Sequence, residues 1–196
     1  MRIVAFIGSP RKGGNSRTLL DEALKGARQA GAELKIFDLP GMKIEGCRNC
    51  GCCADTGNCV IKDDMQLIYP ELRACQGVIL AAPVYFSGLP SQTKAMIDRC
   101  QSIWCEKYLL KKPIPGENRA GLFITVAGMD KKEGEKCSGA TARAFFLTVS
   151  LTDMKKLAYV GIDAKSDVLK HPEALKEVFE AGAEIASGRL KQGISF

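Results

Sequence analysis

The sequence has one histidine, His171, and no apolar run that approaches the length of a bilayer-spanning helix. A single histidine offers no basis for a Ser-His-Asp nucleophilic system, and because Pro172 follows it we expect His171 to end a loop. Secretory cleavage signals are also missing near the N-terminus, so we expect a cytoplasmic protein.

Aromatic residues make up only 7% of the 196 residues. The Lys and Arg residues behind the net charge of +6 are scattered in pairs such as Lys155-Lys156, without the interleaved aromatics or the motifs of a nucleic-acid-binding surface. We interpret such pairs as solvated faces and expect no nucleic-acid or membrane partner.

Two nucleotide-binding motifs are missing from the glycine-rich segment 8–16. Gly8 and Gly13 have the spacing of a Walker loop, but Gly14-Asn15 stands where that loop has Lys-Ser or Lys-Thr. The segment has no G-x-G-x-x-G pattern either, so Asp38 lacks the pyrophosphate turn that a ribose-binding acid accompanies. Neither a magnesium nucleotide nor a dinucleotide is favoured.

The same segment follows the apolar run Ile3–Ile7, which is too short for a helix and predicts a strand buried on both faces. Asn15 or Ser16 can cap the helix expected next. Glycines let the backbone close around an anion, and the helix N-terminus supplies free N–H groups. The donor side chains of the loop are Ser9, Arg11, Lys12, Asn15 and Ser16. A terminal monophosphate such as that of FMN suits this loop; an ordinary turn with solvated cations is the alternative.

Strand-like and helix-like patterns alternate five times, without a linker or an internal repeat. We predict strands at about 3–7, 33–39, 77–82, 121–127 and 157–162, and a fourth helix from about 139 to 153. The fold class is therefore α/β: a flavodoxin-like, doubly wound, five-stranded parallel sheet in the order 2-1-3-4-5, forming a single domain over 1–196. The charged segment 128–136 is interpreted as a mobile loop that closes over a ligand.

In this topology the loops after the first, third and fourth strands meet at one edge of the sheet. We predict that the loops 83–90 and 125–128 flank a flat ring, and that backbone N–H groups around 84–86 and 127–129 bind its polar atoms. The expected residues are Pro83, Val84, Tyr85, Phe86, Ala127 and Gly128. Core packing or a subunit contact is the alternative for Tyr85 and Phe86.

Nine cysteines, an odd number, cannot all pair within one chain, and in a reducing compartment a dense group suggests metal or redox chemistry. A long loop at about 40–62 carries the pattern C-x2-C-x2-C-x5-C, formed by Cys47, Cys50, Cys53 and Cys59. Three cysteines at this spacing can bind three corners of a cubane cluster, and the loop can bring a fourth cysteine back to the remaining corner. One [4Fe-4S] cluster is the favoured occupant.

Other interpretations of the cysteines remain open. Zinc sites usually place two ligand pairs further apart, and a redox disulfide or free thiols would need no metal. Cys52 is a spare thiol within the run. Three cysteines next to predicted helices are expected to be buried as small apolar side chains: Cys75, Cys100 and Cys105.

Taken together, these motifs resemble those of the iron-sulfur flavoprotein family, within the NADPH-dependent FMN reductases and flavodoxin-like proteins. The resemblance covers roughly the first 130 residues. It rests on the segment 8–16, the cysteine run, Asp63-Asp64-Met65, Pro83-Val84-Tyr85-Phe86 and Lys94-Ala95-Met96-Ile97-Asp98-Arg99.

The resemblance implies FMN, held at its phosphate by Ser9, Arg11, Asn15 and Ser16 and at its ring by residues 83–86, and a [4Fe-4S] cluster on the compact cysteines. It also implies a homotetramer, or at least a dimer, in which a cluster lies near a flavin. We therefore predict a flavin-dependent oxidoreductase for electron transport between a ferredoxin-like donor and a small acceptor. The alternatives are an NAD(P)H-dependent FMN or quinone reductase without a cluster, and a non-catalytic binding module with a zinc-stabilised loop.

Overall fold

The computed structural model describes residues 1–112, 114, 116, 119–129 and 132–190. Five parallel strands form one sheet in the order β2-β1-β3-β4-β5, which confirms the predicted topology. The strands are β1 (Arg2–Ile7), β2 (Glu33–Asp38), β3 (Gly77–Pro83), β4 (Ala120–Ala127) and β5 (Asp153–Val160).

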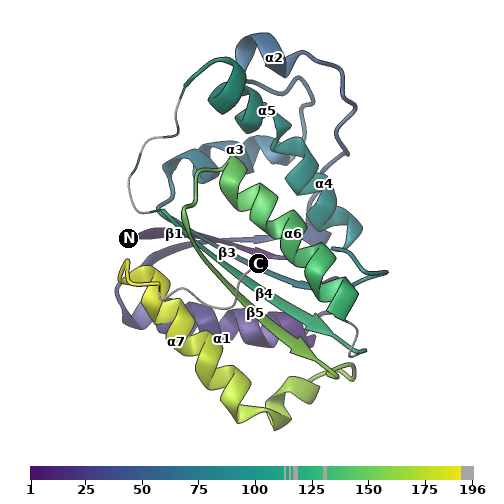
Figure 1. Ribbon diagram of the computed structural model, residues 1–196, viewed down its shortest axis with the longest axis vertical. Helices are drawn as coiled ribbons and strands as arrows, with labels where there is room; N and C mark the ends of the chain where they lie inside the picture. Colours follow the sequence, from purple (N-terminus) through teal and green to yellow (C-terminus); the bar gives the residue numbers. More distant parts are fainter. Residues whose placement is uncertain (113, 115, 117–118, 130–131, 191–196) are drawn as a thin grey trace.

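Helices cover both faces of the sheet (Figure 1). On one face α1 (Asn15–Gln29) lies beside α7 (Pro172–Ala186), and on the other lie α3 (Met65–Ala74), α4 (Ser91–Arg99) and α6 (Lys132–Thr148). The short helices α2 (Cys53–Thr56) and α5 (Gln101–Trp104) lie together at one end of the molecule, and a π-helix, Cys105–Leu109, continues from α5. None of the helices in the described ranges is long and apolar enough to cross a bilayer.

Burial explains the apolar sequences of the three inner strands, β1, β3 and β4. Every residue of β4 is buried, and so are Ile3–Ile7 of β1 and Gly77–Ala82 of β3. Strands covered on both faces need apolar side chains in both directions, which is why they appear in the sequence as continuous apolar runs. The sheet thereby separates two hydrophobic cores, one under α1 and α7 and the other under the helices of the opposite face.

The expected loop at 128–136 and the expected helix start at 139 are wrong, because α6 already begins at Lys132. Residues 130–131 lie outside the described residues, and the interpretation of that part as a lid stays a prediction. Gly134 and Gly139 weaken the helical pattern of the sequence, but packing requires Gly134, because a Cβ atom there would lie 2.7 Å from Val84 Cγ1. Helix propensity was overridden by a close helix–loop contact.

The fifth strand begins at Asp153, earlier than predicted, and Lys155-Lys156 is not a solvated pair. Lys156 is only 4% exposed and its Nζ lies 2.9 Å from a carboxylate oxygen of Glu135 on α6. Lys155 makes the same kind of contact with Glu184 of α7, also at 2.9 Å. Each lysine binds a helix on its own side of the edge strand, an arrangement that sequence spacing does not reveal.

The close packing of α1 and α7 predicts a large effect of one added methyl group. A Cβ atom on Gly182 would lie 1.9 Å from the carbonyl oxygen of Ala23. We expect Gly182→Ala to force the helices apart and to lower the free energy of unfolding by about 1–3 kcal/mol or more, measured by urea denaturation. In the control Gly41→Ala the new Cβ meets nothing within 4 Å, so the change should stay within about 0.5 kcal/mol. Equal losses in the two variants would contradict the packing.

Candidate functional site

The strand-end cavity opens at the carboxyl ends of the strands, the edge at which open parallel sheets bind their ligands. The loops after β1, β3 and β4 contribute to it, as predicted, and the loop after β5 does so too. Its lining comprises Ser9, Arg11, Gly14, Asn15, Ser16, Pro83, Val84, Tyr85, Val126, Gly128, Ile162, Asp163 and Lys165.

The glycine-rich loop forms the floor of this cavity. Gly13 has a φ of +65°, a left-handed conformation that glycine adopts without strain. Gly14 donates its N–H to the carbonyl of Arg11 at 3.0 Å, and the N–H of Arg11 donates to Ser9 Oγ at 3.3 Å. Helix α1 starts immediately afterwards, so the free N–H groups of its first turn and its positive dipole end lie at the cavity.

Asn15 does not cap α1; the capping residue is Gly14, and no side chain caps the helix. Instead, the Asn15 amide donates to the carbonyl of Ala164 at 2.9 Å and to that of Ile162 at 3.5 Å. Its oxygen accepts the N–H of Val168 at 3.2 Å. Asn15 thus fastens the loop after β5 to the glycine-rich loop.

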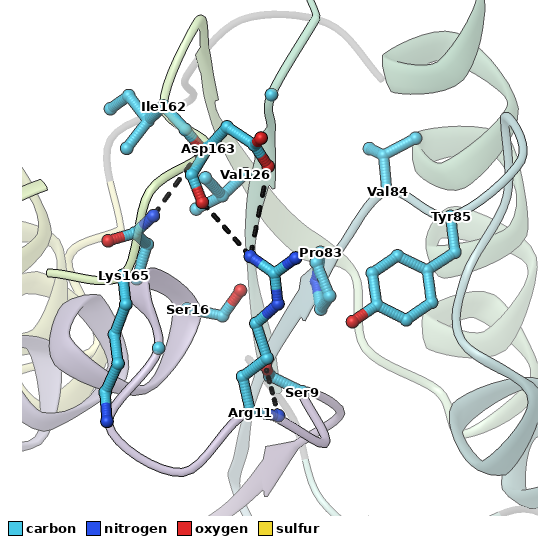
Figure 2. A pocket seen from close by; sticks show the side chains of 13 residues that line it. Ser9, Arg11, Ser16, Pro83, Val84, Tyr85, Val126, Ile162, Asp163 and Lys165 are labelled. Atoms are coloured by element: carbon cyan, nitrogen blue, oxygen red, sulfur yellow. Dashed lines mark hydrogen bonds and ion pairs between the residues drawn. The ribbon is translucent and has the colours of Figure 1, made fainter. Parts of the chain in front are cut away.

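The loop after β5 adds charge to the site. Arg11 reaches across the cavity (Figure 2) and donates from Nη1 to the carbonyl of Asp163 at 3.1 Å, with the Asp163 carboxylate 3.9 Å away. Lys165 extends beside the glycine-rich loop, where its Cε would lie 3.4 Å from a Cβ on Gly13. The cavity therefore holds a guanidinium and an ammonium near the start of α1.

Five lining residues were not among the predicted site residues: Gly14, Val126, Ile162, Asp163 and Lys165. Gly14 was part of the recognised loop but carries no donor side chain. The residues from 162 onward follow β5, which is the edge strand next to β4. Because all carboxyl ends of a parallel sheet lie at one edge, a sequence signal for their proximity did exist.

On the opposite wall Pro83, Val84 and Tyr85 line the cavity as predicted (Figure 2). The expectation that the N–H groups of Val84 and Tyr85 are available to a ring is wrong, because they donate to Val126 at 2.9 Å and to Gly88 at 2.8 Å. The Val84 bond continues the pairing of β3 with β4, and the Tyr85 bond closes a tight turn at 85–88.

Three predicted residues lie outside the cavity lining. Phe86, at a φ of +46° in the turn, is fully exposed. Ala127 is buried in β4, where its carbonyl accepts the N–H of Ile162 at 3.1 Å. Lys12 lines a neighbouring cavity together with Arg17 and Asp38.

The cysteine run lines a second pocket, which shares no lining residue with the first. Its thiols come from Cys47, Cys50, Cys53, Cys59 and Cys105, and Cys52 is not among them. Cys105 is buried, as predicted, but its Sγ lies 3.7 Å from that of Cys53, a proximity that their separation of 52 positions in the sequence concealed. Its lining includes residues of α2 and α5, and these two helices lie together at one end of the molecule (Figure 1).

These thiols differ in acidity. Burial and then the neighbouring Cys105 raise the pKa of Cys53 to about 11. Hydrogen bonds with the backbone and side chain of Cys52 lower the pKa of Cys50. Across the described residues, no three His, Cys, Asp or Glu side chains are arranged to hold a metal ion. The thiols therefore share a pocket without converging on one point.

A buried ion pair closes the base of the cysteine-rich loop. Arg99, 1% exposed, binds Asp63 through Nη1–Oδ2 at 2.6 Å and Nη2–Oδ1 at 3.1 Å. The same guanidinium donates to the carbonyls of Glu45 at 3.0 Å and Ile61 at 3.3 Å, on opposite sides of the loop. Arg99 also lines the cysteine pocket, and its buried Nε has no hydrogen-bond partner among the described residues.

Removing the charge of Asp63 should destabilise the protein. Burial opposes ionisation of Asp63, but hydrogen bonds from Arg99 and from the N–H groups of Glu45 and Met65 outweigh it and lower its pKa. Asp63→Asn leaves a buried guanidinium without its counter-charge, so we expect a loss of about 3 kcal/mol or more of unfolding free energy at pH 7, measured by urea denaturation.

The pH dependence gives a second reading of the same change. A carboxylate with a lowered pKa stabilises the fold above its unfolded pKa, near 4, and this contribution is lost as pH falls through the folded value. The wild type should therefore lose stability below about pH 4 more steeply than Asp63→Asn. Asp98→Asn is the control, since the exposed pair with Lys94 at 2.8 Å is worth less than about 1 kcal/mol. Indistinguishable results for the two variants would show that the ion pair does not hold the loop.

Comparison with known proteins identifies one matching family model and several related proteins. The family model described as NADPH-dependent FMN reductase matches residues 1–163. An iron-sulfur flavoprotein from Methanosarcina thermophila is 37% identical over 136 residues, which cover 69% of this chain and 68% of that protein.

Solved structures share the fold at low sequence identity. A flavone reductase has a TM-score of 0.72 at 19% identity, and the match covers 98% of this chain and 66% of the other. An FMN-dependent NADH-azoreductase from Bacillus anthracis, crystallised with FMN, has a TM-score of 0.70 at 14% identity, covering 95% of this chain and all 100% of the other.

Proposed function

The chain belongs to the NADPH-dependent FMN reductase family and is related within it to the iron-sulfur flavoproteins, and on this premise we propose that its strand-end cavity binds FMN. Membership makes it a flavin-dependent oxidoreductase. The observation that carries the FMN proposal is the glycine-rich loop, which brings the start of α1 and the Arg11 guanidinium into one cavity.

The residues present suit the phosphate end of FMN. Free N–H groups at a helix start, the hydroxyls of Ser9 and Ser16 and the Arg11 guanidinium are the donors that a phosphate dianion requires. Lys12, exposed beside the loop, and Lys165 add positive charge. Asn15 acts indirectly, because its amide holds the loop after β5 in place.

The opposite wall suits a flat ring. Tyr85 and Pro83 present flat surfaces to the cavity, and Val84 and Gly128 also line it. Phe86 and Ala127 contribute through the turn and the strand that position this wall. When bound, FMN exchanges one or two electrons through its ring system, so the chain need only bind, orient and shield it, without a side-chain acid or base.

We further propose that Cys47, Cys50, Cys53 and Cys59 hold a [4Fe-4S] cluster. In support, all four line one pocket, and a buried cation, Arg99, adjoins it with an unused N–H donor suited to a negatively charged sulfur site. Ligands often converge only when a metal binds, so separated thiols do not conflict with the proposal. The donor would be ferredoxin-like and the acceptor small.

The cysteine pocket and the strand-end cavity use different residues of one chain. We therefore propose a homo-oligomer, a dimer or a tetramer, that brings the cluster of one chain near the flavin of another. A cluster-free NAD(P)H-dependent FMN or quinone reductase is the second candidate, favoured by the lack of a converged metal site in the described part of the chain.

Removing Arg11 tests the FMN site. We expect Arg11→Ala to weaken FMN binding about 10- to 100-fold, because one charge-assisted contact worth about 1.5–3 kcal/mol is lost. Quenching of flavin fluorescence during titration of the apoprotein measures the affinity. Arg28→Ala, at the other end of α1, changes the same charge far from the cavity and should leave binding unaltered. Wild-type affinity in Arg11→Ala would place the phosphate elsewhere.

Replacing Cys50 tests the cluster. Protein purified without oxygen should contain iron, sulfide and FMN, and Cys50→Ser should lose the iron and sulfide while it retains FMN. Elemental analysis and absorbance spectra measure both. Cys137→Ser, which alters an exposed thiol on α6, is the control and should keep its iron. Flavin without iron in the wild type, even after reconstitution, would favour the cluster-free reductase.

A further inference from the structure

We propose that Cys53 and Cys105 form a disulfide when the protein meets a small-molecule disulfide such as oxidised glutathione. The modification withdraws Cys53 from the thiols available to iron. The disulfide itself stands on the geometry of the pocket, whereas its effect on iron rests on the cluster in the proposed function.

The first observation in support of the disulfide is the contact between the two sulfur atoms. The Sγ atoms lie 3.7 Å apart, against a disulfide bond length of about 2.05 Å. Small side-chain rotations can close such a gap if the backbones are already near each other. The segments that bear the two cysteines do lie side by side, because a Cβ atom on Gly57, directly after α2, would lie 3.2 Å from Cβ of Glu106 in the π-helix.

The surrounding structure holds the two segments together. Glu106 is fixed to α3 by an ion pair with Arg73 at 2.8 Å, and Gln101 donates to Cys105 Sγ at 3.6 Å. The segment that bears Cys53 is tied at its base by the Arg99–Asp63 pair. Both cysteines therefore lie in anchored parts of the chain and face the same pocket.

Exposure decides the order of reaction. Cys53 is partly exposed and Cys105 is 3% exposed, so the Cys53 sulfur meets the reagent first. Its sulfur, once deprotonated, attacks one sulfur of the small disulfide and releases one thiol. Cys105 then attacks the Cys53 sulfur of the mixed disulfide and releases the second. The two cysteines lose two protons and two electrons, and the reagent gains both as it becomes two thiols.

Oxidation also affects metal binding, because only the thiolate form of cysteine binds iron. A sulfur atom bonded in a disulfide is no longer a thiolate ligand, so oxidation leaves three of the four proposed iron ligands. Cys105 is not needed as a ligand, and its effect is to make iron loading depend on the oxidation state of the pocket.

Peptide mapping tests the disulfide. Full-length protein, reduced and stripped of iron with a chelator, is incubated for hours with oxidised glutathione, alkylated, and digested with trypsin without reduction. Cys53 lies in the tryptic peptide 49–62 and Cys105 in 100–107. We expect the two peptides joined and two hydrogens lighter than their sum. An internal bond within 49–62, such as one between Cys50 and Cys52, with no joined peptide would overturn the proposal.

Each of the two peptides also contains a neighbouring cysteine whose replacement serves as a control. Cys105→Ser and Cys53→Ser should abolish the joined peptide, whereas Cys100→Ser and Cys52→Ser, which alter neighbouring thiols in the same peptides, should retain it. A joined peptide that survives in Cys105→Ser would assign the bond to Cys100 and overturn the proposal.

Iron loading tests the consequence. After reconstitution with iron and sulfide, the oxidised protein should hold severalfold less iron than the reduced protein, and dithiothreitol should restore it. Reduced Cys105→Ser should hold as much iron as the wild type; a loss there would make Cys105 a ligand and overturn the role given to it. If the reduced wild type binds no iron, the proposed cluster fails, while the peptide map still decides on the disulfide.

Discussion

The interior position of β1, between β2 and β3, is the constraint on which the rest of the structure depends. Its neighbours are β2 on one side and β3 on the other, so the chain leaves β1 at the point where the strand order reverses. At such a point the loops diverge to opposite faces and leave a crevice at the carboxyl ends. The glycine-rich loop fills the base of this crevice, and α1 begins there because its apolar face must return across the sheet.

A second constraint is electrostatic. The cysteine-rich loop has little regular structure and would be expensive to order by itself. The buried Arg99–Asp63 pair binds both sides of the loop at its base and joins them to the end of α4, so that the cysteines between them share one pocket. The pair thus gives a poorly structured segment a defined place beside α5 and the π-helix.

The two sites are therefore positioned by different means. The strand-end cavity follows from backbone topology, with its walls formed by loops that every sheet of this order brings together. The cysteine pocket depends on individual side-chain contacts outside the sheet. A flavin in the first and a redox-active thiol set in the second would occupy separate parts of one chain, which is why assembly of several chains matters to the proposed electron transfer.

The sequence by itself determined the sheet order, the glycine-rich loop and the four clustered cysteines, because buried parallel strands, tight turns and short-range spacings leave local patterns. It did not reveal that Asn15 binds the loop after β5, that Lys156 is buried against Glu135, or that Cys105 touches Cys53. It also misplaced the start of α6, whose glycines are explained only by the neighbour that they contact. These features were decided by the tertiary structure, since each depends on which distant segment packs against a residue, and spacing along the chain carries no record of that.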